Sequence, residues 1–289
     1  MKITVYVASA FSKNHKGGNK AGVVLMENTL TNTQKMAIAK QLGYAETAFI
    51  SESDVAEYKF DYFTPKEEVD LCGHATIGSF AILRHLNQLS RNNYTIETNS
   101  GVLAITIKDD ILFMEQNKPI FYEVIAPNEF VDCFDYQVID NNYPIQIVST
   151  GLKDILIPIK SDTQLHGLKP NFEKIKEISQ SYNVIGTHLY TFDENRIICR
   201  NFAPLYDINE EAATGTSNGA LACYLYERGY LQKETYVFEQ GYSLHSLSEI
   251  VVKLATDSQD NIEKVYVGGQ GYYCEAKCLI VEEDLETLE

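Results

Sequence analysis

The chain has 289 residues, which is room for two domains of about 145 residues or for one large domain. Hydrophobic residues make up 45% of it and aromatic residues 11%, so a sizeable core can form and wholesale disorder is excluded. The net charge of −16 repels phosphate backbones and anionic lipids, which argues against nucleic acid or a membrane as the main partner. A small anionic substrate is compatible with this charge, because a single site can be positive on a negative protein.

We expect the protein to be cytoplasmic. No apolar run reaches the roughly 18 residues of a membrane span, and the N-terminal sequence MKITVYVASAF has the pattern of a strand rather than of a signal peptide. The six cysteines are scattered and form no CxxC motif, which fits a reducing compartment better than a disulfide framework.

Short β-rich segments dominate the first part of the chain, and helical patterns interrupt them. A helix is predicted for Thr33–Leu42, because Gly43 provides a stop after it. The segment His74–Leu89 is apolar all round, which is typical of a buried helix. Two further helices are expected at Pro170–Tyr182 and Ser217–Arg228. Strands are predicted for residues 3–9, 21–26, 46–51, 57–63, 94–98, 102–108 and 111–116.

A long internal repeat is the most informative feature of the sequence. Residues 59–83 contain a strand, Phe-Thr-Pro, acidic residues, a glycine and an apolar helix, and residues 198–225 contain the same order with Phe-Ala-Pro. The repeat predicts an α+β protein of two pseudo-symmetric domains, each a curved, mostly antiparallel β-sheet or barrel around a central buried helix. The expected domains are residues 1–116 together with 275–289, and residues 117–274.

Both expected central helices begin with a glycine followed by small or polar residues, at Gly73–Thr76 and Gly215–Asn218. Glycine allows a ligand to approach the backbone, and a helix N-terminus presents unpaired N–H groups that attract anions. If the two halves face each other, both helix starts would meet one cleft and could hold a carboxylate. A single such motif would be only a helix cap, but two copies in register favour a binding site.

Glu46 and His74 are the candidate acid and base. Glu46 would lie on a strand face with Ala48 and Ile50, where burial can raise the pKa of its carboxyl toward neutrality. A strand-edge glutamate that reaches solvent is an equally good interpretation of this pattern. His74 could donate a proton or simply cap its helix. Because His74 and Cys72 lack partner ligands at a recognisable spacing, no metal site is expected.

Residues 215–219 match the G-x-S-x-G motif of serine hydrolases, with Ser217 as the nucleophile. The motif needs a buried strand directly before it, and the preceding segment 207–211 is polar and acidic instead. Only His245 follows as a candidate partner. A serine hydrolase is therefore a weak alternative. The isolated glycine loops match no phosphate-binding fingerprint, so no nucleotide cofactor is implied.

Several segments together resemble the phenazine-biosynthesis PhzF-like family. They are GN at 18–19, ETAF at 46–49, FTP at 63–65, VDLCGHAT at 69–76, FAP at 202–204 and ATG at 213–215. The resemblance covers nearly the whole chain. It implies the diaminopimelate-epimerase-like fold with a cleft between two halves, a homodimer, and isomerase chemistry by proton shift on a small carboxylate without a cofactor.

The resemblance also implies roles for particular residues. Glu46 matches the acid/base glutamate of the family, Gly73 and His74 match its substrate-binding pair, and Asn19 matches the asparagine of its first glycine loop. In the second half, Gly215 matches the second helix-start glycine. We expect Glu211 to be catalytic, by positioning the substrate or assisting the proton transfer, and Gly215 and Thr216 to bind its anionic group through their backbone N–H groups. The related epimerases use a cysteine on each side, but only Cys72 is present here, and we interpret it as a packing residue.

Three departures from the family pattern affect the substrate more than the reaction. Glu211 stands where the family usually has aspartate, Thr216 replaces serine, and Lys20 replaces proline. These changes also motivate an alternative of a different class, a binding protein that keeps the fold and has lost turnover.

Overall fold

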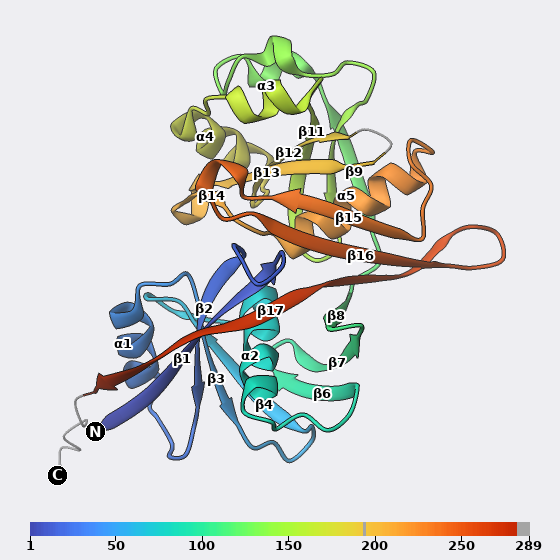
Figure 1. Cartoon of the computed structure of the whole chain (residues 1–289). Helices are drawn as coiled ribbons and strands as arrows, with labels where there is room; N and C mark the ends of the chain where they lie inside the picture. Colours follow the sequence, from blue (N-terminus) through green and yellow to red (C-terminus); the bar gives the residue numbers. More distant parts are fainter. Residues whose placement is uncertain (193–194, 282–289) are drawn as a thin grey trace. The chain divides into compact units, whose positions relative to one another are not determined.

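The computed structural model describes residues 1–192 and 195–281, and these residues divide into two compact units (Figure 1). The first unit contains Met1–His15, Asn19–Met114 and the segment that begins at Gly269, and the second contains Lys16–Gly18 and Glu115–Gly268. The sequence predicts domain boundaries after residues 116 and 274, whereas the chain passes from one unit to the other after Met114 and after Gly268. Within the described ranges, no helix is long and apolar enough to cross a membrane.

The first unit is a mostly antiparallel sheet that surrounds one helix, α2 (Gly73–His85), with a second helix, α1 (Asn32–Leu42), packed outside (Figure 1). Two pairings are parallel, between β2 and β3 and between β4 and β6. Its strands are β1 (Lys2–Ser12), β2 (Asn19–Leu25), β3 (Thr47–Ser51), β4 (Tyr58–Phe63), β5 (Glu68–Val69), β6 (Asn93–Thr98), β7 (Gly101–Lys108), β8 (Ile111–Gln116) and the end of β17 (Ile262–Ile280).

The second unit repeats this plan around helix α5 (Gly215–Glu227), with α3 (Asp162–Gly167) and α4 (Phe172–Tyr182) outside the sheet. Four short 3₁₀ helices connect its elements, η1 (Pro127–Phe130), η2 (Tyr136–Val138), η3 (Pro204–Tyr206) and η4 (Tyr242–Leu244). Its strands are β9 (Ile120–Ile125), β10 (Ile145–Ser149), β11 (Lys153–Pro158), β12 (Gly186–Phe192), β13 (Ile197–Ala203), β14 (Ile208–Glu211), β15 (Thr235–Gln240), β16 (Ser248–Thr256) and the start of β17.

The strand register confirms the predicted internal repeat. Thr47 pairs with Phe63 across β3 and β4, and Thr187 pairs with Phe202 across β12 and β13. In each unit the strand before this hairpin joins it in parallel, β2 on β3 and β11 on β12. Helices α2 and α5 have 13 residues each, and nine of the 13 are buried in both. The fold is therefore the α+β, pseudo-symmetric architecture that the sequence predicted.

The helix limits follow the local sequence signals with one exception. Helix α1 begins with a capping box in which Thr31 and Gln34 bond reciprocally, and it ends at Gly43 in the left-handed conformation. Helix α2 was expected to continue to Leu89 but ends at His85. Asn87 adopts a left-handed conformation with φ of 57°, which stops the helix although the apolar residues continue.

At Gly186 the backbone of β12 lies against the backbone of β13 with no room for a side chain. A Cβ at this position would lie 2.0 Å from the carbonyl oxygen of Phe202. Phe202 is fully buried on the neighbouring strand, so the backbone there cannot move away without disturbing the core of the second unit. The absence of a side chain at position 186 is therefore a packing requirement.

We predict that Gly186→Ala lowers the free energy of unfolding by about 2–3 kcal/mol, because the added methyl forces two buried strands apart. Gly167→Ala is the matched control, since Gly167 has free space around its Cα and no positive φ. Its expected change is within about 0.5 kcal/mol. Urea unfolding of both variants measures the difference, and equal stabilities would contradict the packing argument.

Candidate functional site

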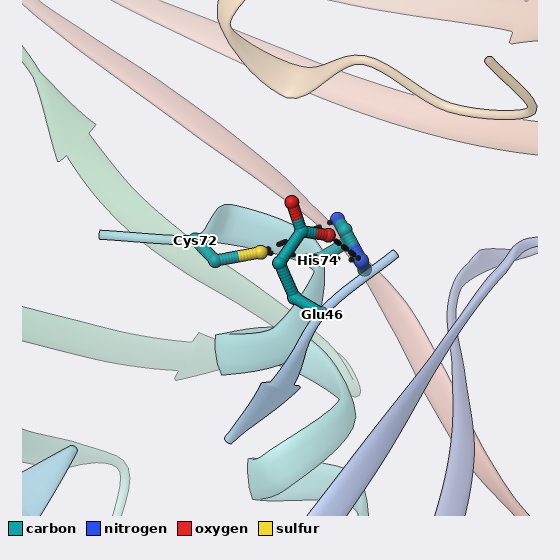
Figure 2. A group of neighbouring side chains, drawn as sticks. All are labelled: Glu46, Cys72 and His74. Atoms are coloured by element: carbon teal, nitrogen blue, oxygen red, sulfur yellow. Dashed lines mark hydrogen bonds and ion pairs between the residues drawn. The ribbon is translucent and has the colours of Figure 1, made fainter. Parts of the chain in front are cut away.

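Three side chains of the first unit gather where its central helix begins (Figure 2). Glu46 lies directly before β3, in the turn that follows the end of α1 at Gly43. Cys72 is the N-cap residue of α2, and His74 is the second residue of that helix. The fold thus brings a strand start and a helix start, 26 residues apart in the sequence, to one place.

The three side chains contact one another in the order Glu46, His74, Cys72. His74 Nε2 lies 3.1 Å from Glu46 Oε2, and Cys72 Sγ lies 3.4 Å from His74 Nδ1 (Figure 2). Cys72 and His74 are buried, whereas 19% of the Glu46 side chain is exposed. The imidazole is therefore held between a thiol and a carboxylate, and the carboxylate is the group that a ligand can reach.

The pKa of Glu46 is shifted in the opposite direction to the one that the sequence predicted. Burial pushes the pKa of Glu46 upward, but the adjacent His74, with a smaller effect of Cys72, outweighs burial and lowers this pKa below its ordinary value. The prediction that burial would raise the pKa of Glu46 toward neutrality is wrong, because it left out the imidazole. Burial by itself would lower the pKa of His74, yet Cys72 and Glu46 raise it well above its ordinary value.

Cys72 is protonated at neutral pH, because burial and the negative charge of Glu46 raise the pKa of its thiol. Its backbone carbonyl accepts a 2.7 Å hydrogen bond from Thr76 Oγ1, which in turn lies 2.6 Å from the Tyr62 hydroxyl. This buried chain fixes the first turn of α2. Glu46 thus favours the charged form of the His74 imidazole and disfavours the thiolate form of Cys72.

In the second unit, Glu211 is held by a short hydrogen-bonded turn before α5. Thr214 Oγ1 donates to Glu211 Oε2 over 2.6 Å. Gln240, which is fully buried on β15, donates through Nε2 to the Glu211 carbonyl over 2.8 Å and to Thr214 Oγ1 over 3.0 Å. Gln240 Oε1 accepts from Asn218 Nδ2 over 3.0 Å. No sequence pattern pointed to Gln240, because it lies far along the chain from the turn that it fixes.

The two neighbouring glutamates of the second unit have different surroundings. Glu210 forms a buried ion pair with Arg200 over 2.9 Å, and Arg200 also donates to the Leu165 and Leu168 carbonyls. Glu210 therefore has a structural role, because its ion pair with Arg200 links β14 to β13 and α3. Glu211 is half-buried and remains the candidate for a functional role.

The remaining candidates lie at the starts of elements. Asn19 is the first residue of β2 in the first unit, and Gly73 opens α2 beside the Glu46 site. Gly215 and Thr216 open α5 in the second unit, where Thr150 Oγ1 donates to the Thr216 carbonyl over 3.2 Å. The structure thus brings Glu46, Gly73 and His74 together. A shared site for these residues and the second-unit candidates stays a prediction.

Ser217 belongs to a buried polar network and lacks the partner that a nucleophile needs. Its hydroxyl donates to Asp154 Oδ2 over 2.5 Å and accepts from Asn201 Nδ2 over 3.2 Å. Asn201 Nδ2 also lies 3.2 Å from His188 Nδ1. All four side chains are buried, and Ser217 has no exposed surface. The serine-hydrolase alternative is therefore wrong, because Ser217 contacts a carboxylate and an amide instead of an imidazole.

This network has no counterpart at matching positions of the first unit. Aligning the two hairpins by register places His188 opposite Ala48 and Asn201 opposite Tyr62. Burial raises the pKa of Asp154 to about 6, although Ser217 and the Gly186 N–H act in the opposite direction. Burial lowers the pKa of His188 to about 4, so this imidazole is neutral near pH 7.

Comparison with known proteins agrees with this architecture. The family described as phenazine biosynthesis-like protein matches residues 8–276. An uncharacterized isomerase of Clostridium acetobutylicum is 31% identical over 281 residues, which cover 91% of this chain and 93% of that relative.

Two solved structures show the same fold. A phenazine biosynthesis protein of the PhzF family from Bacillus anthracis superposes with a TM-score of 0.89 at 27% identity, covering 97% of this chain and 99% of that chain. A hydroxyproline epimerase from Agrobacterium vitis, with bound trans-4-hydroxy-L-proline, superposes with a TM-score of 0.63 at 11% identity, covering 99% and 93%.

We predict that Asp154 makes stability fall as the pH rises. The folded state holds its proton up to about pH 6, whereas the unfolded chain releases it near pH 4, so the contribution of Asp154 to the free energy of unfolding falls by about 3 kcal/mol between these values. His188 acts in the opposite direction over this range in both the wild type and Asp154→Asn, so the contribution of Asp154 is the difference between the two profiles. Asp154→Asn keeps the acceptor for Ser217 and removes this drop. Urea unfolding between pH 4 and pH 7 measures it, with the exposed Asp54→Asn as the control. A pH profile of Asp154→Asn parallel to that of the wild type would contradict the prediction.

Proposed function

The chain belongs to the phenazine biosynthesis-like (PhzF) family, and from this premise we propose that this isomerase moves a proton on a small carboxylate substrate by general acid/base catalysis without a cofactor. The observation that carries the proposal is the contact between Glu46 and His74. A partly exposed carboxylate paired with a buried imidazole supplies a base and an acid within one site.

Glu46 is the proposed base. It is ionised at neutral pH because the adjacent His74 lowers its pKa, and it is the most exposed of the three grouped side chains. A carbon next to a carboxylate or another electron-withdrawing group can lose a proton to such a base. Glu46 would carry that proton and return it to a different carbon of the same substrate, so that the net reaction is an isomerisation.

His74 is the proposed electrophilic partner. Its neighbours Cys72 and Glu46 raise its pKa and so favour the protonated imidazole, and a positive charge beside the reacting carbon stabilises negative charge that develops in the transition state. When Glu46 accepts the substrate proton, its carboxylate loses its negative charge. The imidazole of His74 would then interact more strongly with the negative charge on the substrate. Cys72 keeps the ring oriented by its contact at Nδ1.

Backbone N–H groups at the start of α2 are the proposed binding group for the substrate carboxylate. Cys72 occupies the N-cap position without capping the helix through its side chain, and the helix dipole favours an anion there. A small carboxylate is also what the hydroxyproline epimerase of the same fold has bound. Substrate contacts of Asn19, Glu211, Gly215 and Thr216 stay predictions, as does the homodimer.

We predict that Glu46→Gln lowers the rate of proton exchange by about 10²–10⁴-fold, because glutamine keeps the shape of the side chain and cannot accept the proton. Small carboxylates that raise the melting temperature are incubated with the protein in D₂O, and deuterium uptake at carbon is followed by NMR. Glu52→Gln, which changes an exposed glutamate outside the site, is the control.

The outcomes separate the two function classes that the sequence left open. Uptake by the wild type and by Glu52→Gln, but not by Glu46→Gln, supports the isomerase. Undiminished uptake by Glu46→Gln overturns the assignment of Glu46. Binding without deuterium uptake into any stabilising carboxylate favours a binding protein that has lost turnover.

A further inference from the structure

The Glu46–Cys72–His74 group is also a ligand set for a divalent transition metal. We propose that this site binds one Zn²⁺ ion through the Glu46 carboxylate, the Cys72 thiolate and one imidazole nitrogen of His74. Because the ion would occupy the carboxylate that serves as the base, we further infer that Zn²⁺ inhibits the isomerase. This second part rests on the proposed function, whereas metal binding itself does not.

The spacing of the three ligand atoms suits a zinc ion. One ligand atom from each residue lies within 4.8 Å of the others, with 3.1 Å from His74 Nε2 to Glu46 Oε2 and 3.9 Å from Cys72 Sγ to Nε2. Tetrahedral zinc with ordinary bond lengths holds its ligand atoms about 3.3–3.6 Å apart. Two of these separations, 3.1 and 3.9 Å, lie within about 0.5 Å of the tetrahedral values.

The chemistry of the ligands selects the metal. A thiolate and an imidazole bind zinc and similar ions, whereas magnesium and calcium prefer sites made of oxygen atoms alone. Binding releases the thiol proton of Cys72 and the imidazolium proton of His74 to solvent. A doubly charged ion with one carboxylate and one thiolate is neutral, so the buried site gains no net charge.

The three ligand residues differ in their exposure to solvent. Cys72 and His74 are buried, while 19% of the Glu46 side chain faces solvent. Three protein ligands with one accessible side are typical of zinc sites that also bind water or another small molecule. The Cys-x-His spacing alone did not predict this site, because its third ligand comes from a turn 26 residues earlier.

Cobalt substitution tests the metal site without any substrate. Co²⁺ bound by a thiolate gives an intense near-ultraviolet absorption, so titration of the purified protein should give this band at one ion per chain, and Zn²⁺ should displace it. Cys72→Ser should remove the band and weaken binding by more than the roughly 10- to 100-fold that loss of an outer partner causes. Cys278→Ser, which changes an exposed free cysteine, should match the wild type.

The results separate this proposal from the proposed function. No band, or a band that survives in Cys72→Ser, overturns the metal site. If Cys72→Ser does not fold, as judged by circular dichroism, His74→Asn takes its place, and a band retained there overturns the site equally. Zinc binding that leaves deuterium uptake unchanged overturns the inhibition alone, and loss of uptake in Glu46→Gln is decided independently of any metal.

Discussion

The ion pair between Glu46 and His74 is the interaction on which the account of this protein depends. Burying either group alone would neutralise it, because burial raises the pKa of a carboxyl and lowers that of an imidazole. Their contact, with Cys72 acting on the other side of the ring, outweighs burial, so that the pKa of Glu46 is lowered and the pKa of His74 is raised. The Cys72 thiol, whose own pKa is raised by burial and by Glu46, lies 3.4 Å from Nδ1 of the same ring. The proposed proton transfer and the proposed metal site share the side chains of Glu46 and His74.

The fold around this site was largely predictable from the sequence, because its signals are local and occur twice. Apolar patterns identified both central helices, and the alignment of Phe63 with Phe202 identified a repeat that the structure realises as two hairpins of equal register. The short helix α3 was not predicted, and the end of α2 was placed four residues too late. A left-handed Asn87 stops that helix while the apolar residues continue, and the conformation of a single residue is not visible in an apolar pattern.

The sequence could nominate residues for the candidate site but could not predict their electrostatics. Glu46 and His74 could be selected by residue type and position, whereas their mutual contact depends on where the chain returns in space. For the same reason the pKa of Glu46 was expected to move in the wrong direction. Asp154 and Gln240 were missed because nothing in their local sequence distinguishes them from surface residues, and their importance comes only from burial.

The state of the His74 ring is the most direct test of the account. Nitrogen–proton correlation NMR, with His74→Asn used to assign the signal, reports whether both ring nitrogens carry a proton. We expect a doubly protonated ring at pH 7.5 in the wild type, and a lower pKa of His74 in Glu46→Gln, because the carboxylate stabilises the charged ring. A neutral ring at pH 7.5 in the wild type, or a pKa of His74 that Glu46→Gln leaves unchanged, would contradict the account.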